Sequence, residues 1–268
     1  MIFKLDGTIE NTLALTPVIF GWKEMTDEKV FLNVLYPELF DRNPYVDGIV
    51  TKSMPNEGLL DFNQISWQSV QKPVCETFMH FVFGKHRPTC WRTLMYHTEE
   101  DAKKAEAFVP DKAVVVAMKN IPEGLMESLT REGYLVTKLT HQDCKSFHVF
   151  RAAVSRASLY IGDDGDDTAI AMTTDVPAVV CYTWRNPVYF TPFRRGIPFE
   201  VVSPRKEDCL YSDGCLSNGL FEFGKTYQIR CYYDVPNTMK EKMVCQRNAT
   251  LQRIMQAVEK IRAKVCRH

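Results

Sequence analysis

Apolar and polar positions follow one another along this chain in short blocks that are typical of an α/β protein. Short apolar runs predict buried strands at 2–5, 30–35, 113–117, 134–139, 159–161 and 178–182. Stretches with helical spacing of apolar residues lie between them, at 73–84, 123–132 and 147–156. Because strands and helices alternate, we expect parallel sheets with right-handed crossover connections.

The sharpest local pattern lies at 157–187. A strand is followed by the polar turn Gly-Asp-Asp-Gly-Asp-Asp-Thr at 162–168, a helix and a second strand, which together form a βαβ unit. Free N–H groups at the start of such a helix favour an anion. The four carboxylates of this turn mean that a phosphate there would need neighbouring cations or a metal. The alternative is that the aspartates only cap the helix and shape the turn.

The composition adds limits to this picture. The chain has 268 residues, of which 45% are hydrophobic and 25% charged, and this fits one large globular domain or two of moderate size. A formal net charge of zero argues against a surface devoted wholly to nucleic acid, although a local basic groove is compatible with it. No apolar run approaches the ~20 residues of a membrane span, and the first residues lack the form of a secretion signal. We expect a cytoplasmic protein. Two more specific alternatives are the inner membrane surface and, for a phage-encoded protein, the cytoplasm of the host.

Nine cysteines are present, and most are expected to be reduced in such a compartment. Four of them lie between residues 209 and 245: Cys209, Cys215, Cys231 and Cys245. Their spacings, C-x5-C and C-x13-C, differ from the pairs expected of structural zinc. Zinc therefore stays open there, but a loop-fastening role or no role is favoured, and the site predicted below contains no metal.

Stretch 157–187 resembles the C-terminal signature of the ADP-heptose:lipopolysaccharide heptosyltransferase family of GT-B glycosyltransferases. The matching positions are Gly162, Asp164, Ala171, Pro177, Val179 and Pro187. The resemblance implies that the turn holds the diphosphate of a nucleotide-sugar donor. By position, the residues that would contact the donor are Asp164, Gly165 and Asp166. We also predict that Asp167 and Thr168 of the same turn belong to the donor site. Two positions depart from the family, whose His falls on Ala169 and whose Gly falls on Asp166.

The start of the chain resembles the opening of the same family. The matching positions are Gly7, Ile9, Leu13, Thr16 and Pro17. The family's catalytic Asp, thought to deprotonate the acceptor hydroxyl, falls on Asn11, and an amide cannot act as that base. The neighbouring Glu10 is the first replacement candidate and Asp6 a weaker one. The alternative is that Glu10 is an exposed residue in the first turn of a helix.

Three further residues are donor-site candidates. Lys119 follows a predicted strand and lies in a loop comparable to one in which the family has a Lys that approaches the donor phosphate. Gln142 lies in the loop where the family binds the ribose or base. Arg185 is a candidate cation for the diphosphate, as are Arg194 and Arg195. The alternative for each is an ordinary surface side chain.

The resemblance extends from about residue 2 to about residue 261 and implies two Rossmann-like domains that face a central cleft. The expected division gives an acceptor-side domain at 1–107 and a nucleotide-sugar-binding domain at 108–268. A clean amphipathic helix at 248–265 is expected to cross back to the first domain.

The implied activity is transfer of a sugar from a nucleotide-sugar, of the ADP or UDP type, to a hydroxyl of a glycan or lipid-linked sugar. Inversion of the anomeric carbon and independence of metal are expected from the family. The first alternative keeps the chemistry with a different acceptor, a hydroxymethyl-pyrimidine base of phage DNA. The second alternative is a non-catalytic binding protein with the same fold, which Asn11 and Ala169 favour.

Overall fold

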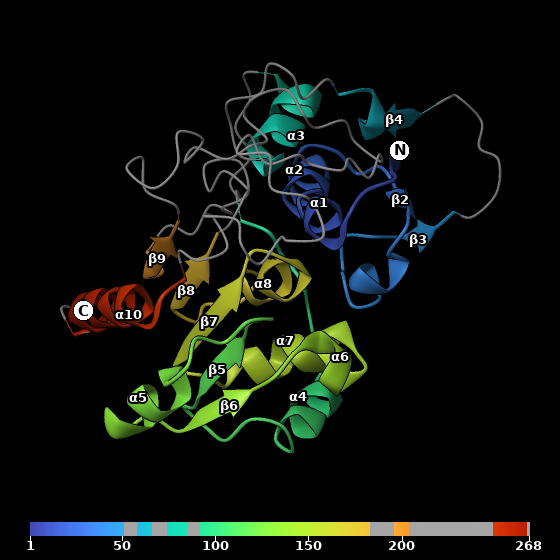
Figure 1. Cartoon of the computed structure of the whole chain (residues 1–268). Coiled ribbons are helices and arrows are strands. Elements are labelled where there is room, and N and C mark those ends of the chain that lie inside the picture. Colours follow the sequence, from blue (N-terminus) through green and yellow to red (C-terminus); the bar gives the residue numbers. More distant parts are fainter. Residues whose placement is uncertain (51–57, 66–73, 85–91, 183–195, 204–248, 267–268) are drawn as a thin grey trace, which may run out of the picture.

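The computed structural model describes residues 1–50, 58–65, 74–84, 92–182, 196–203 and 249–266 of the chain. These residues form two parallel β-sheets, one of four strands and one of five, with helices packed on them (Figure 1). The predicted α/β class with two parallel sheets is thereby confirmed.

The N-terminal sheet has the strand order β3-β2-β1-β4, and every neighbouring pair is parallel. Its strands are β1 (Ile2–Leu5), β2 (Phe31–Val34), β3 (Gly48–Ile49) and β4 (Leu59–Asp61). The helical segments of this half are α1 (Ile9–Leu13), α2 (Thr16–Met25), η1 (Pro37–Phe40), η2 (Phe62–Gln64) and α3 (Val74–Phe83). Pro17 lies in the first turn of α2, where its missing N–H removes no helical hydrogen bond.

The C-terminal sheet has the order β6-β5-β7-β8-β9 and is also parallel throughout. Its strands are β5 (Val114–Ala117), β6 (Val136–Lys138), β7 (Leu159–Asp163), β8 (Ala178–Cys181) and β9 (Phe199–Val202). Its helices are α4 (Glu99–Ala105), α5 (Leu125–Arg131), α6 (His141–Cys144), α7 (Phe147–Ser155), α8 (Asp166–Ala171) and α10 (Leu251–Val265). Strands β5 and β8 are buried along their whole length because helices cover both faces of the sheet (Figure 1).

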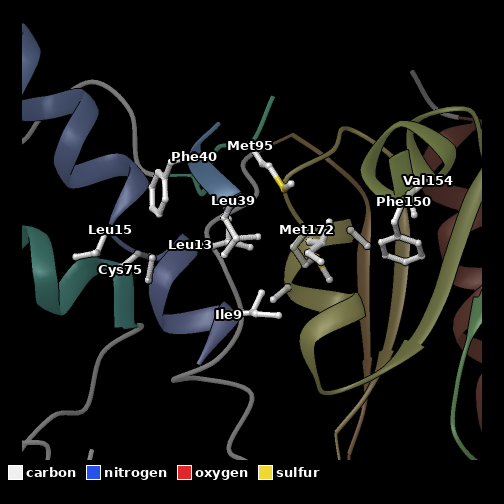
Figure 2. Close-up of a cluster of buried hydrophobic side chains, with 14 of the residues drawn as sticks. Ile9, Leu13, Leu15, Leu39, Phe40, Cys75, Met95, Phe150, Val154 and Met172 are labelled. Atoms are coloured by element: carbon white, nitrogen blue, oxygen red, sulfur yellow. The ribbon is translucent and has the colours of Figure 1, made fainter. Parts of the chain in front are cut away.

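Alternate residues of these strands belong to different apolar cores. Val115 and Tyr160 pack on the side of α7 and α8, whereas Val114 and Ile161 pack on the side of α5 and α10. The first of these cores continues without interruption into the N-terminal half. Figure 2 shows Ile9 and Leu13 of α1 facing Met172, which directly follows α8, so the two halves share one apolar core.

The segment that joins the halves is hydrogen-bonded to both of them. The backbone N–H of Leu94 donates to Thr16 Oγ1 at the start of α2, at 2.7 Å. Arg92 reaches the opposite half, where it contacts the Asp175 carboxylate at 2.6 Å and the Thr173 carbonyl at 3.1 Å. Helix α4, which follows this segment, packs against α7. The division of the chain at residue 107 stays a prediction.

The last helix, α10, differs from its prediction. Its apolar stripe contains Ile254, Val258 and Ile261, which lie in one core with residues of β5, β7 and β8. The helix packs against β8 and β9, at the far side of the C-terminal sheet from α1 (Figure 1). The predicted crossing back to the N-terminal half is therefore wrong for the described residues. The physical reason is that the sheet offers this helix an uncovered apolar face.

Candidate functional site

Each sheet has one place where the strand order reverses, and ligands of open α/β sheets bind there, beyond the carboxyl ends of the strands. In the C-terminal sheet this place lies between β5 and β7. The loop after β5 contains Lys119, and the turn after β7 runs from Asp164 to Gly165 before α8 begins. The predicted donor residues thus gather at the position where the topology alone would place a ligand.

Asp163, the last residue of β7, connects these two loops. Its carboxylate accepts a hydrogen bond of 2.8 Å from the backbone N–H of Lys119. Burial raises the pKa of the Asp163 carboxyl, and the hydrogen bond and the charge of Lys119 offset part of that rise. This carboxylate therefore holds the two loops together.

Tyr160 of β7 packs against the start of the turn that follows this strand. An added Cβ at Gly162 would lie 2.3 Å from the Tyr160 hydroxyl, so the phenol ring occupies the space that a side chain would need. The Tyr160 hydroxyl lies 3.0 Å from Thr168 Oγ1, which in turn donates to the Asp163 carbonyl. Thr168, a predicted donor residue, is buried and supports the turn from inside.

A second carboxylate of the turn binds the neighbouring loop. Asp167 Oδ1 accepts from the backbone N–H of His141 at 2.7 Å and lies 2.8 Å from His141 Nδ1. Since a carboxylate only accepts, the proton of this contact sits on Nδ1. Asp167 thus ties α8 to the start of α6, and the loops after β5, β6 and β7 form one connected unit.

A cavity of about 380 Å³ opens beside this unit, between η1 of the N-terminal half and the α6–α7 segment. Its lining residues are Glu38, Asp41, His141, Gln142, Lys145, Ser146, Phe147 and His148. The predicted ribose or base residue, Gln142, is among them. The cavity is large enough for a small organic ligand, and it combines charged side chains of both signs with one aromatic ring.

The corresponding reversal in the N-terminal sheet lies between β1 and β4. Asp6, which follows β1, donates its backbone N–H to Asn63 Oδ1 at 2.9 Å, and its carboxylate accepts from Asn63 Nδ2 at 3.2 Å. Asp6 is exposed, whereas Asn63 is held further by Asp61. This pair places an exposed carboxylate at the second position that the topology favours.

Asn11 and Glu10 lie on α1, which packs against α8. Asn11 is only 3% exposed, and within the described part of the chain its Oδ1 atom has no hydrogen-bond partner. Glu10 is partly exposed. Of the three predicted catalytic residues, the two carboxylates are therefore accessible and the amide is not.

The structure does not place every predicted residue. Arg185, Arg194 and Arg195 lie outside the described residues, as do Cys209, Cys215, Cys231 and Cys245. Among the residues that are described, no group of three or more His, Cys, Asp or Glu side chains is arranged to hold a metal ion. The prediction missed Asp163 and Lys145, and only Asp163 carried a usable signal, its place at the carboxyl end of a strand.

Comparison with known proteins identifies the fold. No protein-family model and no curated protein sequence matches this chain. Solved structures do match, and they are GT-B glycosyltransferases, the class that the resemblance predicted; the fold is confirmed at this level.

Three of these matching structures align with nearly the whole chain. A family 9 glycosyl transferase from Veillonella parvula matches with a TM-score of 0.66 at 9% identity, covering 97% of this chain and 96% of its own. The ADP-heptose lps heptosyltransferase II of E. coli matches with a TM-score of 0.65 at 9% identity, and the match covers 97% of this chain and 98% of that enzyme's chain. The E. coli heptosyltransferase WaaC with ADP matches with a TM-score of 0.59 at 8% identity, and the match covers 97% of this chain and 99% of the WaaC chain. In the helices that the structure describes, none is long and apolar enough to cross a membrane.

Proposed function

We propose that this chain is a glycosyltransferase that moves a sugar from a nucleotide-sugar to an acceptor hydroxyl. The observation that carries the proposal is the connected unit of three loops at the reversal of the C-terminal sheet, beside a cavity of about 380 Å³. The GT-B fold supports it, although a fold alone does not define an activity.

In this proposal the donor lies across the three loops. Its nucleoside occupies the cavity beside Gln142 and Lys145, and its diphosphate meets the turn of Asp164, Gly165 and Asp166, with Lys119 of the neighbouring loop as a cation. Asp163 and Asp167 accept hydrogen bonds from N–H groups of the neighbouring loops, which hold these two carboxylates in place beside the turn. An ADP-type donor is favoured, since two matching E. coli WaaC structures hold ADP and a fluorinated ADP-heptose.

The N-terminal half supplies the base that removes the proton of the acceptor hydroxyl. We assign this role to Glu10, which is accessible and lies on the helix that packs against α8, and we keep Asp6 as the rival. Inversion follows if the base and the departing diphosphate lie on opposite sides of the sugar. Backbone N–H groups and Lys119 then stabilise the leaving group without a metal. The acceptor is a glycan or a lipid-linked sugar.

A second candidate, a non-catalytic nucleotide-sugar-binding protein, is favoured by one observation. The residue at the family's base position, Asn11, is a buried amide that cannot take up a proton. This candidate shares the donor site with the first and lacks only the base. Binding of a donor without its turnover would favour it.

The first test is a thermal-shift panel of ADP, UDP, GDP and CDP with the full chain, each with and without EDTA. A ligand at a hundred times its dissociation constant adds about 2.7 kcal/mol to the free energy of unfolding. We expect one base type to raise Tm, no effect of EDTA, and a reduced shift in Lys119→Ala. Lys103→Ala, an exposed lysine of α4, is the matched control. No shift with any of the four would contradict the proposal, and an acceptor screen, DNA included, follows from a positive result.

A further inference from the structure

His148 on α7 contacts two backbone carbonyls at once. Its Nδ1 lies 2.6 Å from the Tyr96 carbonyl oxygen and its Nε2 lies 2.8 Å from the Glu38 carbonyl oxygen. A carbonyl oxygen only accepts hydrogen bonds, and a neutral imidazole carries a single N–H. Both contacts are hydrogen bonds only when both ring nitrogens are protonated, so this geometry requires an imidazolium.

The alternative state is costly at this place. His148 is 6% exposed, and in the neutral ring one nitrogen lone pair would point at a carbonyl lone pair with little access to water. The Glu38 carbonyl also accepts the backbone N–H of Asp41 at the end of η1. It is therefore a terminal carbonyl of a helical turn, where a positive partner is favourable.

The two carbonyls belong to different parts of the molecule. Glu38 lies in η1 of the N-terminal half, Tyr96 lies in the segment that joins the halves, and His148 belongs to the C-terminal half. Glu38 and His148 also both line the cavity of about 380 Å³. His148 thus holds together the two walls between which we place the nucleoside.

Acidic side chains lie near His148 and would stabilise a positive charge on its ring. On α4, burial acts to raise the pKa of the Asp101 carboxyl, but hydrogen bonds from Thr98 and the positive charges of His148 and Arg42 lower it overall. The Asp101 side chain is 10% exposed and is a nearby negative partner. From η1 and the loop after it, Glu38 and Asp41 line the same cavity.

Basic side chains also face this region, and those that are charged oppose a charge on His148. Lys145 and His141 line the cavity from α6 and the residue after it, and Arg151 lies one turn further along α7. His97 has the complementary role to His148. It accepts a hydrogen bond from the Arg151 guanidinium through Nδ1, and burial, followed by the charge of Arg151, lowers its pKa. His97 thus accepts a hydrogen bond through its ring, whereas the two carbonyls beside His148 can only accept from it.

We propose that His148 is a positioning residue that acts as an imidazolium, fixing η1 against α7, and that nucleotide binding in the cavity is thereby coupled to proton concentration. The coupling to a nucleotide rests on the proposed function; the charged contact itself does not. Loss of the proton removes one of the two hydrogen bonds and loosens the wall that η1 forms. Because both hydrogen bonds need the charged ring, we expect the stability that they contribute to fall as pH rises.

The charged contact is tested by unfolding temperatures of the full chain between about pH 6 and pH 8.5, the range over which histidines lose their charge. In His148→Gln the amide can donate to one carbonyl without a charge. We expect the Tm difference between wild type and this variant to be largest at pH 6 and to fall by at least half at pH 8.5. The control is His80→Gln, an exposed histidine whose Nδ1 contacts a single carbonyl. A Tm difference that does not change with pH, or ring-nitrogen NMR that shows one protonated nitrogen at pH 6, would overturn the proposal.

The coupling is tested by calorimetric titration with ADP over the same pH range. We expect Kd to rise with pH about threefold to tenfold more in wild type than in His148→Gln, with wild-type behaviour in His80→Gln. Equal pH slopes in wild type and His148→Gln would overturn the coupling. If ADP does not bind at any pH, the donor assignment fails and the coupling with it, and the unfolding temperatures alone then decide whether His148 is charged.

Discussion

The two sheets reverse their strand order at comparable places, but the residues at these places are organised differently. In the C-terminal half, Asp163 and Asp167 bind Lys119 and His141 of the neighbouring loops. In the N-terminal half one exposed Asp6 is held by Asn63. We infer that the proposed donor side carries a preorganised site, whereas the proposed acceptor side presents few fixed groups and has an amide, Asn11, where the heptosyltransferase family has a carboxylate.

The strands beneath these places show the same contrast. All four residues of β5 and of β8 are buried, while in β1 only Phe3 and Leu5 are. A strand buried on both faces fixes the loop that follows it, because neither face can adapt without opening a core. The proposed donor loops therefore follow the more fully buried strands, whereas Asn11, at the position of the heptosyltransferase family's base, lies on the other half.

The largest expected effect lies on the acceptor side. Glu10→Gln should lower turnover of the donor about 10²- to 10⁴-fold, because it removes the proposed base, while leaving donor affinity unchanged. The measurement is release of nucleoside diphosphate from the nucleotide-sugar that the binding panel selects. Asp6→Asn is the matched variant and should reduce the rate far less. The reverse order would transfer the role to Asp6, and an unchanged rate in both would favour the non-catalytic candidate.

On the donor side, Gly162→Ala should destabilise the protein by about 2–3 kcal/mol. The new methyl group would overlap the phenol ring of Tyr160, which is fully buried. Gly165→Ala is the control, because an added Cβ there meets nothing within 4 Å and its φ of −178° suits any residue. Chemical denaturation compares the two variants, and equal stabilities would show that the turn is less tightly packed than described.

Removing the tie between two donor loops should have a smaller effect. Asp167→Ala deletes the acceptor of both His141 hydrogen bonds, so we expect ADP affinity to fall about tenfold with a loss of about 1–2 kcal/mol in stability. Asp111→Ala, at an exposed ion pair with Arg156, is the control and should change neither. Unaltered ADP affinity in Asp167→Ala would return Asp167 to a purely structural role.

The smallest expected effect depends on pH. Because burial raises the pKa of Asp163, its ionised form disfavours the folded state, and this destabilisation grows as pH rises through the raised pKa. Asp163→Asn, which can still accept from the Lys119 N–H, should therefore be slightly more stable than wild type at pH 7 and lose that gain near pH 3. Asp111→Asn should show no such trend. A gain that persists at low pH would mean that desolvation of the charge is not its cause.

Local patterns and the family resemblance were sufficient to predict most of the fold. The βαβ unit of β7, α8 and β8 follows from apolar runs that flank a Gly- and Asp-rich turn, and these signals are local. The sheet against which α10 packs could not be predicted in the same way. Its apolar stripe shows that the helix is buried on one side but does not say against which sheet, and β9 lies about 50 residues earlier in the chain.

The candidate site was predictable only where its residues follow strands. Lys119 and the turn at 162–168 lie at strand ends and were found, whereas the opposite wall of the cavity, formed by Glu38 and Asp41, was not. The contacts of His148 join positions 52 and 110 residues away, and no local pattern marks such a residue. Its double contact depends on how the two halves pack, which is a property of the tertiary structure.

The most direct test of the donor site is a crystal structure of the chain grown with ADP. We predict that the diphosphate lies against the turn between β7 and α8, near Lys119, and that the base lies in the cavity between η1 and the α6–α7 segment, beside Gln142. Electron density for ADP at another place, or an empty cavity at saturating ADP, would contradict the assignment of the C-terminal half as the donor side.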